Sequence, residues 1–302
     1  MIKSRIAAID IGSNTVHMIV AERTPGGRLI HRLDRSKLLK LGLIQIRAGN
    51  LPDFVIGSIR RTLELFVREA RDAGASEILI GATAAVRDDS RRQTIASRLG
   101  QAVGIPVRII SKAREIQLGF LAARHQLRSQ GRQIFIDSGG ASTEVTLCQG
   151  QRPMQTVSLP VGASRLSLLL EGDPPSLLSF ARMMGPIRDA LPKAPPTRDV
   201  QAALFSGGSA HHIGDVAGSK RRLLSRAEID LALRHLLRKR AKKVGRKYQV
   251  DPRRIPILIS GALILGAILE HYGLDRATVT ANSVREGMIR AYLSNPAGWW
   301  KD

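Results

Sequence analysis

The residues best suited to chemistry lie in a motif that the chain contains twice. One copy reads IAAIDIGSNTVHMIV and the other reads IFIDSGGASTEVTL, which matches Asp10 with Asp137 and Gly12 with Gly139, 127 positions further on. Each copy is an apolar strand that ends in an acid, a tight turn of small polar residues and a second strand whose residues alternate. Two matched hairpin tips predict a site that grips one ligand from both sides.

The chemistry of these tips favours a phosphate. Glycine lets backbone N–H groups close on an anion, hydroxyls add donors, and the acid that ends the first strand can hold a cation beside it. A third glycine turn follows a predicted strand at residues 201–205. One such turn more often only ends a strand, but three of them, two with a matched Asp, reverse that expectation. The candidate phosphate-binding residues are Gly12, Ser13 and Asn14, then Gly139, Gly140, Ser142 and Thr143, and finally Gly207, Gly208 and Ser209.

The elements that must position these tips alternate along the chain. Strand-like runs such as EILIGAT are followed by segments with helical spacing, which predicts an α/β fold with a partly parallel sheet. A chain of 302 residues exceeds one comfortable core, and the spacing of the repeat suggests the same cut. We therefore expect two domains, residues 1–128 with the first hairpin and residues 129–302 with the second. Neither a Walker A loop nor a G-x-G-x-x-G fingerprint follows a strand, so P-loop and Rossmann folds find no support.

The net charge of the chain indicates which classes of partner it can bind. It has 47 Lys and Arg against 25 Asp and Glu, a net charge of +22, which attracts polyanions in general. Aromatic residues make up only 4%, which disfavours a single-strand nucleic-acid binder without excluding nucleic acid. Ser225 and Glu228 form a capping box that predicts a helix running to about Tyr248. The stretch from Arg234 to Lys247 holds eight basic residues and no acid, and it is open whether this is a solvated face or a track for a polyanion.

The cysteine content and the apolar segments of the chain indicate its cellular compartment. The single cysteine, Cys148, can form no internal disulfide, which fits a reducing interior. The N-terminus enters a strand at once without a signal-peptide core, and the apolar stretch 257–269 is too short to span a bilayer. We expect a cytoplasmic protein that does not engage a membrane. A homodimer is left open.

Several motifs together resemble one family. DIGSNTVHM, GATAAVR, the helix entered at SKAREIQLGF, DSGGASTE, LPVGASRL, SGGSA and the terminal VREGM occur in the order expected of exopolyphosphatase/guanosine pentaphosphate phosphatases (Ppx/GppA). The resemblance covers nearly the whole chain. It implies a two-domain actin-like ATPase fold, which is ribonuclease H-like, with the active site in the interdomain cleft. The length matches the short members of the family.

The resemblance also implies roles for individual residues. Glu115 stands where the family keeps its catalytic base, and Arg87 matches an arginine that holds phosphate oxygens. Asp137 and Glu144 match the acids linked with a divalent cation, Mg²⁺ or Mn²⁺, and Asp10 stands opposite them. A carboxylate within reach of a water can orient and deprotonate it for attack on phosphorus.

Some positions depart from the family pattern. Ala141 replaces a loop glycine, Ser138 an apolar residue, and Arg114 and Gln117 an acid and an arginine that flank Glu115 in the family. A positive charge at Arg114 would lower the pKa of a nearby carboxylate and weaken it as a base. After the third glycine turn, Ser209 and His211 replace a Thr and an Arg. The pair His211–His212 lacks an evident third ligand for a metal site.

The expected function is a magnesium-dependent exopolyphosphatase that removes terminal phosphates from inorganic polyphosphate. Guanosine pentaphosphate is left open as a further substrate. The alternatives are a catalytically weak sensor that binds polyphosphate or a guanosine alarmone in the same fold, and, third, an ATP-dependent kinase of that fold.

Overall fold

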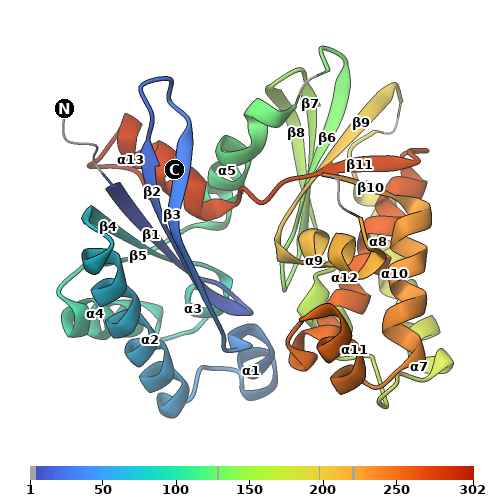
Figure 1. Ribbon diagram of the computed structural model, residues 1–302, viewed down its shortest axis with the longest axis horizontal. Helices are drawn as coiled ribbons and strands as arrows, with labels where there is room; N and C mark the ends of the chain where they lie inside the picture. Colours follow the sequence, from blue (N-terminus) through green and yellow to red (C-terminus); the bar gives the residue numbers. More distant parts are fainter. Residues whose placement is uncertain (1–4, 128, 197, 220–221) are drawn as a thin grey trace. The chain divides into compact units, whose positions relative to one another are not determined.

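The structure, a computed structural model, describes residues 5–127, 129–196, 198–219 and 222–302 (Figure 1). The chain divides into two compact units. Unit 1 runs to Ala122 and also takes in Asn282–Asp302, and unit 2 is Ala123–Ala281.

This division corrects the predicted domains in one respect. The predicted boundary at residue 128, which lies outside the described residues, is close to the observed one, but residues 282–302 belong to unit 1 and not to the second domain. The reason is apolar packing, because Val284, Met288 and Ile289 of the C-terminal helix are buried in one cluster with residues of the first strand such as Ile6 and Ala8.

Unit 1 is built on a five-stranded sheet in the order β3-β2-β1-β4-β5. β1, β2 and β3 form an antiparallel meander, whereas β4 and β5 run parallel to β1. Its strands are β1 (Arg5–Ile11), β2 (Thr15–Arg23), β3 (Leu29–Leu38), β4 (Ala75–Ala82) and β5 (Val107–Ile109). Its helices are α1 (Leu41–Ala48), α2 (Asp53–Asp72), α3 (Ala84–Arg87), α4 (Arg92–Val103), α5 (Lys112–Ala123) and α13 (Val284–Ser294).

Unit 2 repeats this plan. Its sheet has the order β10-β11-β9-β6-β7-β8, so that β8-β7-β6-β9-β11 reproduces β3-β2-β1-β4-β5, with β6, β7 and β8 antiparallel and β9 and β11 parallel to β6. The strands are β6 (Arg132–Ser138), β7 (Thr143–Gln149), β8 (Arg152–Leu159), β9 (Val200–Ser206), β10 (Leu223–Ser225) and β11 (Arg276–Val279). The predicted repeat is therefore a repeat of the fold, and the chain has the two-domain, actin-like, ribonuclease H-like α/β architecture.

The helices of unit 2 cover its sheet. They are α6 (Ala163–Ser167), α7 (Leu177–Arg182), α8 (Met184–Ala190), α9 (Gly208–Ala217), α10 (Arg226–Arg238), α11 (Ala241–Tyr248) and α12 (Ile255–His271), with 3₁₀ turns at Arg124–Gln126, Leu191–Lys193 and Pro252–Arg254. The predicted capping box at Ser225 is present, but the helix ends at Arg238, because Lys239 has an extended backbone, and α11 follows as a separate helix. The single predicted helix to Tyr248 is thus wrong.

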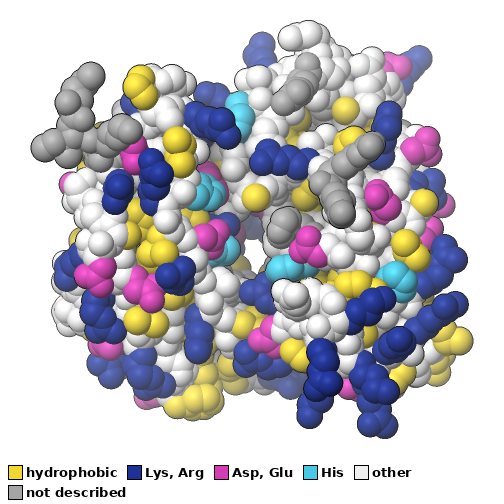
Figure 2. Space-filling view, in the orientation of Figure 1, with side chains coloured by type: hydrophobic (Ala, Val, Ile, Leu, Met, Phe, Trp, Pro, Cys, Tyr) yellow, Lys and Arg dark blue, Asp and Glu magenta, His cyan; other side chains and the backbone are white. Residues whose placement is uncertain are grey.

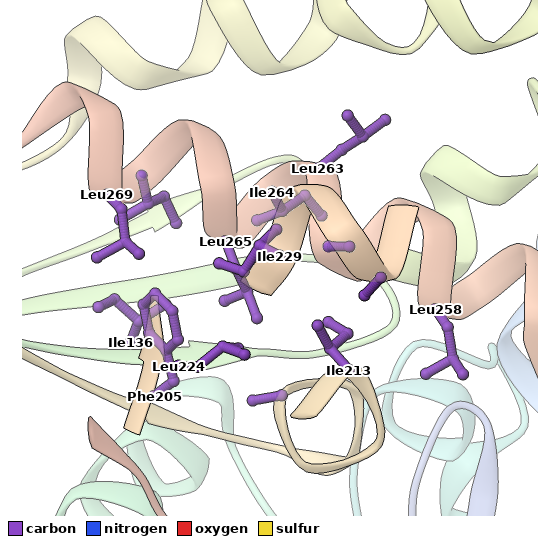
Figure 3. Packing of buried hydrophobic residues seen from close by; sticks show 14 of the residues in the cluster. Ile136, Phe205, Ile213, Leu224, Ile229, Leu258, Leu263, Ile264, Leu265 and Leu269 are labelled. Carbon is purple, nitrogen blue, oxygen red and sulfur yellow. The ribbon is translucent and has the colours of Figure 1, made fainter. Parts of the chain in front are cut away.

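The core of unit 2 gathers around α12. Leu258, Leu265 and Leu269 of this helix pack with Phe205 of β9 and Ile229 of α10 in one buried cluster (Figure 3). By length and composition the segment Pro252–His271 is the one described helix that could cross a membrane, but 67% of its apolar window is buried inside the structure. Its apolar character is accounted for by the core.

The carbonyl groups of the first hairpin tip accept hydrogen bonds from the start of α1 and from the residues just before it. The N–H of Gly42 donates to the carbonyl of Ser13 at 2.7 Å, and the N–H groups of Leu39 and Lys40 donate to that of Asn14 at 2.9 and 2.8 Å. A side chain at Gly42 would meet the Cβ of Ser13 at 2.9 Å. The tip is thus fixed by hydrogen bonds from backbone N–H groups to its carbonyl oxygens.

The second tip is held in the same way by the start of α6. The N–H of Ala163 donates to the carbonyl of Gly139 at 2.9 Å, and those of Ser164 and Arg165 donate to that of Gly140 at 2.9 and 3.0 Å. This segment is the LPVGASRL motif of the sequence. Its small residues are required because the backbone of Gly162 lies directly against the tip.

We expect Gly162→Ala to destabilise the protein by about 1 to 3 kcal/mol, the usual cost of overpacking. A methyl group there would lie 2.3 Å from the carbonyl carbon of Ala141 and 2.4 Å from the amide nitrogen of Ser142, and backbone atoms cannot turn away. Urea unfolding measures the change. Gly185→Ala in α8, where an added Cβ meets nothing within 4 Å, is the matched control and should be neutral or stabilising. Equal stability of the two variants would contradict this account of the tip.

Candidate active site

Strand register decides where Asp10 points. Ile6 and Ala8 of β1 are buried in the cluster that contains α5 and α13 residues, and side chains two apart on a strand share a face. Asp10 therefore ends the same row, with His17 of β2 as its direct partner across the hairpin and Gly81 of β4 on its other side. The sheet thus presents its one acid in this row to the face that α5 and α13 cover.

Glu115 and Arg87 form an ion pair on that side of the sheet. The Nη1 of Arg87, at the end of α3, donates to Oε2 of Glu115 in the first turn of α5 at 2.5 Å and to the carbonyl of Ile110 at 3.2 Å. Its Nε donates to Oδ1 of Asp88 at 3.2 Å. The Glu115 side chain is 29% exposed and that of Arg87 17%. Glu115 is thus oriented by a guanidinium and still reachable by water.

Asp10 is perturbed by its surroundings. Burial, followed by the negative charge of Glu115, raises the pKa of Asp10 to about 7, although the charges of Arg285 and Arg87 and a long 3.4 Å hydrogen bond from the Thr83 hydroxyl act in the opposite direction. Two carboxylates that interact this strongly in a partly buried place are a common sign of a functional site. Such an arrangement also favours a cation.

Sequence reasoning missed Arg285, although the VREGM motif that contains it was recognised. Arg285 is only 7% exposed and donates from Nε and Nη2 to the Ser283 hydroxyl at 3.0 and 2.9 Å. Its buried Nη1 has no hydrogen-bond partner among the described residues. Motif membership was the available signal, whereas burial of the guanidinium beside Asp10 could not be read from a helical pattern.

Thr83 was also missed as a site residue. It follows β4 as Gly207 follows β9, so GATAAVR and SGGSA occupy equivalent places in the two units. The Thr83 N–H and hydroxyl donate to the carbonyl of Ile11 at 3.2 and 3.3 Å. The third predicted glycine turn therefore has a counterpart in unit 1.

In unit 2, Asp137 and Glu144 are direct partners in the β6–β7 register, so their side chains share one face about 5 Å apart at Cβ. The hydroxyls of Ser142 and Ser158 each donate to Oε1 of Glu144 at 2.8 Å. Gly207 has φ 104°, and a Cβ there would lie 3.5 Å from Oδ1 of Asp137. The third turn thus lies against Asp137, and only glycine suits this close, left-handed position.

The donor set fits a hard cation. Within the described ranges no group of three or more His, Cys, Asp or Glu side chains is gathered as a metal site. Magnesium keeps several waters and needs only one or two carboxylates, which the pair Asp137 and Glu144 can supply. Asp10 belongs to unit 1, and its participation in one site with that pair stays a prediction.

The departures from the family pattern have definite contacts. Arg114 donates from Nε and Nη2 to the carbonyl of Trp299 at 3.0 and 2.8 Å and from Nη1 to Gln117 Oε1 at 2.8 Å. These two residues therefore pair with each other and anchor the C-terminal segment. The side chain of Ser209 lies against Gly261 of α12, where a methyl would meet its Cβ at 2.7 Å.

Of the predicted pair His211–His212, the side chain of His211 lies outside the described part of the structure. The Nδ1 of His212 lies 3.5 Å from Oδ2 of Asp215, one turn further along α9.

The predicted site residues fall into two groups. Unit 1 brings Asp10, Arg87 and Glu115 together beside the Gly12–Asn14 tip, and unit 2 brings Asp137, Glu144 and Gly207 together beside the tip at residues 139–143. The N–H groups of Gly140 and Ala141 donate to no partner within the described part of the chain. With the tip carbonyls engaged behind, these N–H groups are suited to an anion.

Comparison with known proteins agrees with this geometry. The Ppx/GppA phosphatase family matches residues 19–295. Exopolyphosphatase 1 of Mycobacterium tuberculosis (strain H37Rv) is 26% identical over 307 residues, covering 97% of this chain and 89% of that protein.

Two crystal structures show the same fold. A Ppx/GppA family member from Aquifex aeolicus has a TM-score of 0.79 at 23% identity and covers 98% of this chain and 99% of its own. An exopolyphosphatase from Cytophaga hutchinsonii has a TM-score of 0.82 at 20% identity, with 96% and 98% covered.

Asp10→Asn should change the pH dependence of stability. Because the pKa of Asp10 is about 7 in the folded protein and about 3.9 in an unfolded chain, the folded state holds a proton that unfolding releases between about pH 4 and 7. Wild-type stability falls through that window and levels off above it. Relative to wild type, the variant should gain about 1 to 2 kcal/mol from pH 4 to pH 8, less than the full shift implies, since Asp10 keeps some solvent contact.

Urea unfolding in EDTA at several pH values measures this gain. Asp88→Asn, which removes the exposed carboxylate that pairs with Arg87, serves as the control. A constant difference between Asp10→Asn and wild type across the window would mean that Asp10 is not the perturbed group.

Proposed function

We propose that this chain, which belongs to the Ppx/GppA phosphatase family, hydrolyses the terminal phosphoanhydride bond of inorganic polyphosphate. The observation that carries the proposal is the Glu115 carboxylate, which Arg87 orients at 2.5 Å and which remains 29% exposed beside Asp10 and the first tip. A relative that spans nearly the whole chain is named an exopolyphosphatase. Guanosine pentaphosphate, which carries the same bond, is a second substrate to test.

Glu115 is proposed to be the general base. A water beside it attacks the terminal phosphorus in line with the bridging oxygen, and the water proton passes to the carboxylate. The bond between the terminal phosphorus and the bridging oxygen breaks. Orthophosphate leaves, and the shortened chain keeps the bridging oxygen as part of its new terminal phosphate.

Arg87 has two tasks in this scheme. Its Nη1 fixes the orientation of Glu115, and its second terminal nitrogen, Nη2, donates to no described residue, so it can contact an oxygen of the transferred phosphoryl group. Such a contact would stabilise the negative charge as the bridging bond breaks. The N–H groups of Gly140 and Ala141 in unit 2 are candidate uncharged donors to a phosphate.

A divalent cation fits the site as well. When bound, Mg²⁺ neutralises phosphate oxygens around the scissile bond. Asp137 and Glu144 would hold it, with Asp10 as the candidate third acid, and the Ser142 and Ser158 hydroxyls keep Glu144 in place.

The residues that differ from the family pattern have contacts that favour catalysis over a non-catalytic sensor. The sensor alternative depended on Arg114, Gln117 and Ala141. The guanidinium of Arg114 donates to Trp299 and Gln117, while Arg87 donates to Glu115. Arg114 is thus anchored on two neutral acceptors, the Trp299 carbonyl and the Gln117 amide oxygen, and Arg87 is the arginine that orients Glu115 in the proposed role.

Glu115→Gln should reduce phosphate release from long polyphosphate by about 10²-fold or more, the usual contribution of a general base. Binding of polyphosphate should stay within a few fold, because the amide keeps the shape of the side chain. Phosphate release is measured from long polyphosphate, guanosine pentaphosphate and ATP, with and without magnesium, and binding is measured separately.

Asp88→Asn, which removes the other carboxylate on Arg87, is the control and should retain most activity. Turnover near that of wild type in Glu115→Gln would remove this residue from the role of base. Release from none of the substrates by the wild type would favour the sensor.

Asp137→Asn should raise the magnesium concentration needed for half-maximal activity, since one anionic ligand becomes neutral. A magnesium titration of phosphate release at saturating tripolyphosphate gives the measurement. Asp199→Asn changes an exposed acid of unit 2 before β9 and should leave the titration unchanged. An identical titration for Asp137→Asn would assign this residue to capping the turn and not to the cation.

A further inference from the structure

A basic surface covers α10 and α11 of unit 2. All of its members are exposed, and Figure 2 shows Lys and Arg side chains gathered over the part of unit 2 where these helices lie. The basic surface consists of Arg234, Arg238, Lys239, Arg240, Lys242, Lys243, Arg246 and Lys247.

The fold does not need these charges. The helices are anchored by their opposite side, where Leu233, Leu236 and Val244 are buried in the core of unit 2. Within the described ranges, none of the eight side chains forms an ion pair with a carboxylate. Asp173 accepts a hydrogen bond from the N–H of Ala241 at 2.6 Å, and Asp230 is an exposed acid of α10, four residues before Arg234.

The arrangement is locally unfavourable without an anion. Lys242 and Arg246, and likewise Lys243 and Lys247, are like charges four residues apart on one helix, which destabilises a helix. Lys242 and Lys243 also lie in the first turn of α11, at the positive end of its dipole. A bound polyanion removes both conflicts.

The general basicity of the chain does not explain this surface. The exposed face of α2 in unit 1 also carries four Arg, but α2 holds four acids as well. Arg60 pairs with Glu64 at 2.8 Å, and Glu69 pairs with Arg35 of β3 at 3.0 Å. α2 is therefore a charge-balanced solvated helix, unlike the basic surface.

We propose that the basic surface binds linear polyphosphate outside the active site and so adds affinity for long chains. The proposal rests on the proposed function for its choice of ligand. A run of cations without a paired acid suits a polymer that carries charge on every unit and releases counterions when bound. Nucleic acid is less suited, because Tyr248 is the one aromatic residue of α10 and α11 and its ring is stacked with His235 and covered by Lys247.

The test replaces Lys239, Lys242 and Lys243 by Gln in the full chain. The Michaelis constant for long polyphosphate should rise about tenfold at low salt, and its dependence on salt should flatten by a log–log slope of up to about 2, near 0.7 for each lost contact with a flexible strand. The constant for tripolyphosphate should change less than twofold, since that ligand is too short to reach beyond the active site. Circular dichroism checks that the helices are kept.

A matched control separates this surface from net charge. Arg61, Arg68 and Arg98 are exposed residues of α2 and α4 in unit 1, and their replacement by Gln removes the same three charges. This control should leave the long-chain constant within twofold. Equal effects of the two triple variants, or equal effects on long and short chains, would overturn the proposal.

Direct binding keeps the proposal testable if the proposed function fails. Should the wild type release no phosphate, the affinity of both triple variants for labelled long polyphosphate is measured by fluorescence anisotropy, and a selective loss in the α10–α11 variant still supports the surface. Competition by a single-stranded DNA of equal charge is the last arm. Displacement of polyphosphate at equal concentration would assign the surface to nucleic acid and overturn the proposal.

Discussion

Each candidate phosphate-binding tip depends on hydrogen bonds from backbone N–H groups to its carbonyl oxygens. In unit 1 the Gly42 N–H holds the Ser13 carbonyl at 2.7 Å, and in unit 2 the Ala163 N–H holds the Gly139 carbonyl at 2.9 Å. These bonds engage the tip carbonyls and fix the peptide planes, so the N–H groups are set before a ligand arrives. An anion bound at either tip would therefore need no rearrangement of the backbone. Gly42 and Gly162 follow from this constraint, since an added Cβ would lie 2.9 Å from the Ser13 Cβ in the first case and 2.3 Å from the Ala141 carbonyl carbon in the second.

The electrostatics of unit 1 follow from the charged side chains beside its hairpin tip. Asp10 ends its strand among buried neighbours and close enough to Glu115 for the two negative charges to oppose each other. Arg87 and Arg285 offset this repulsion, the first by direct contact with Glu115 and the second from the start of α13. The C-terminal segment is therefore part of the site's charge balance as well as part of the core of unit 1.

Much of this was predictable because it rests on local pattern. The hairpin repeat, the α/β class and the Ser225 capping box depend on strand alternation, turn residues and spacing, and these are confirmed. The return of α13 to unit 1 was not predictable, because its apolar stripe shows that it packs on a sheet but not on which one. The destination of Arg114 depends on the carbonyl of Trp299, which lies far along the chain. The break at Lys239 carries no glycine or proline to mark it.

The duplicated frame also shows how the two halves differ. The residue across from the first acid is His17, whereas the residue across from the second is Glu144. His17 is paired with Asp34 at 2.6 Å, and burial lowers its pKa, so it adds little positive charge at neutral pH. Glu144 instead places a second carboxylate beside Asp137. One frame therefore positions a carboxylate paired with an arginine in unit 1 and two adjacent carboxylates in unit 2.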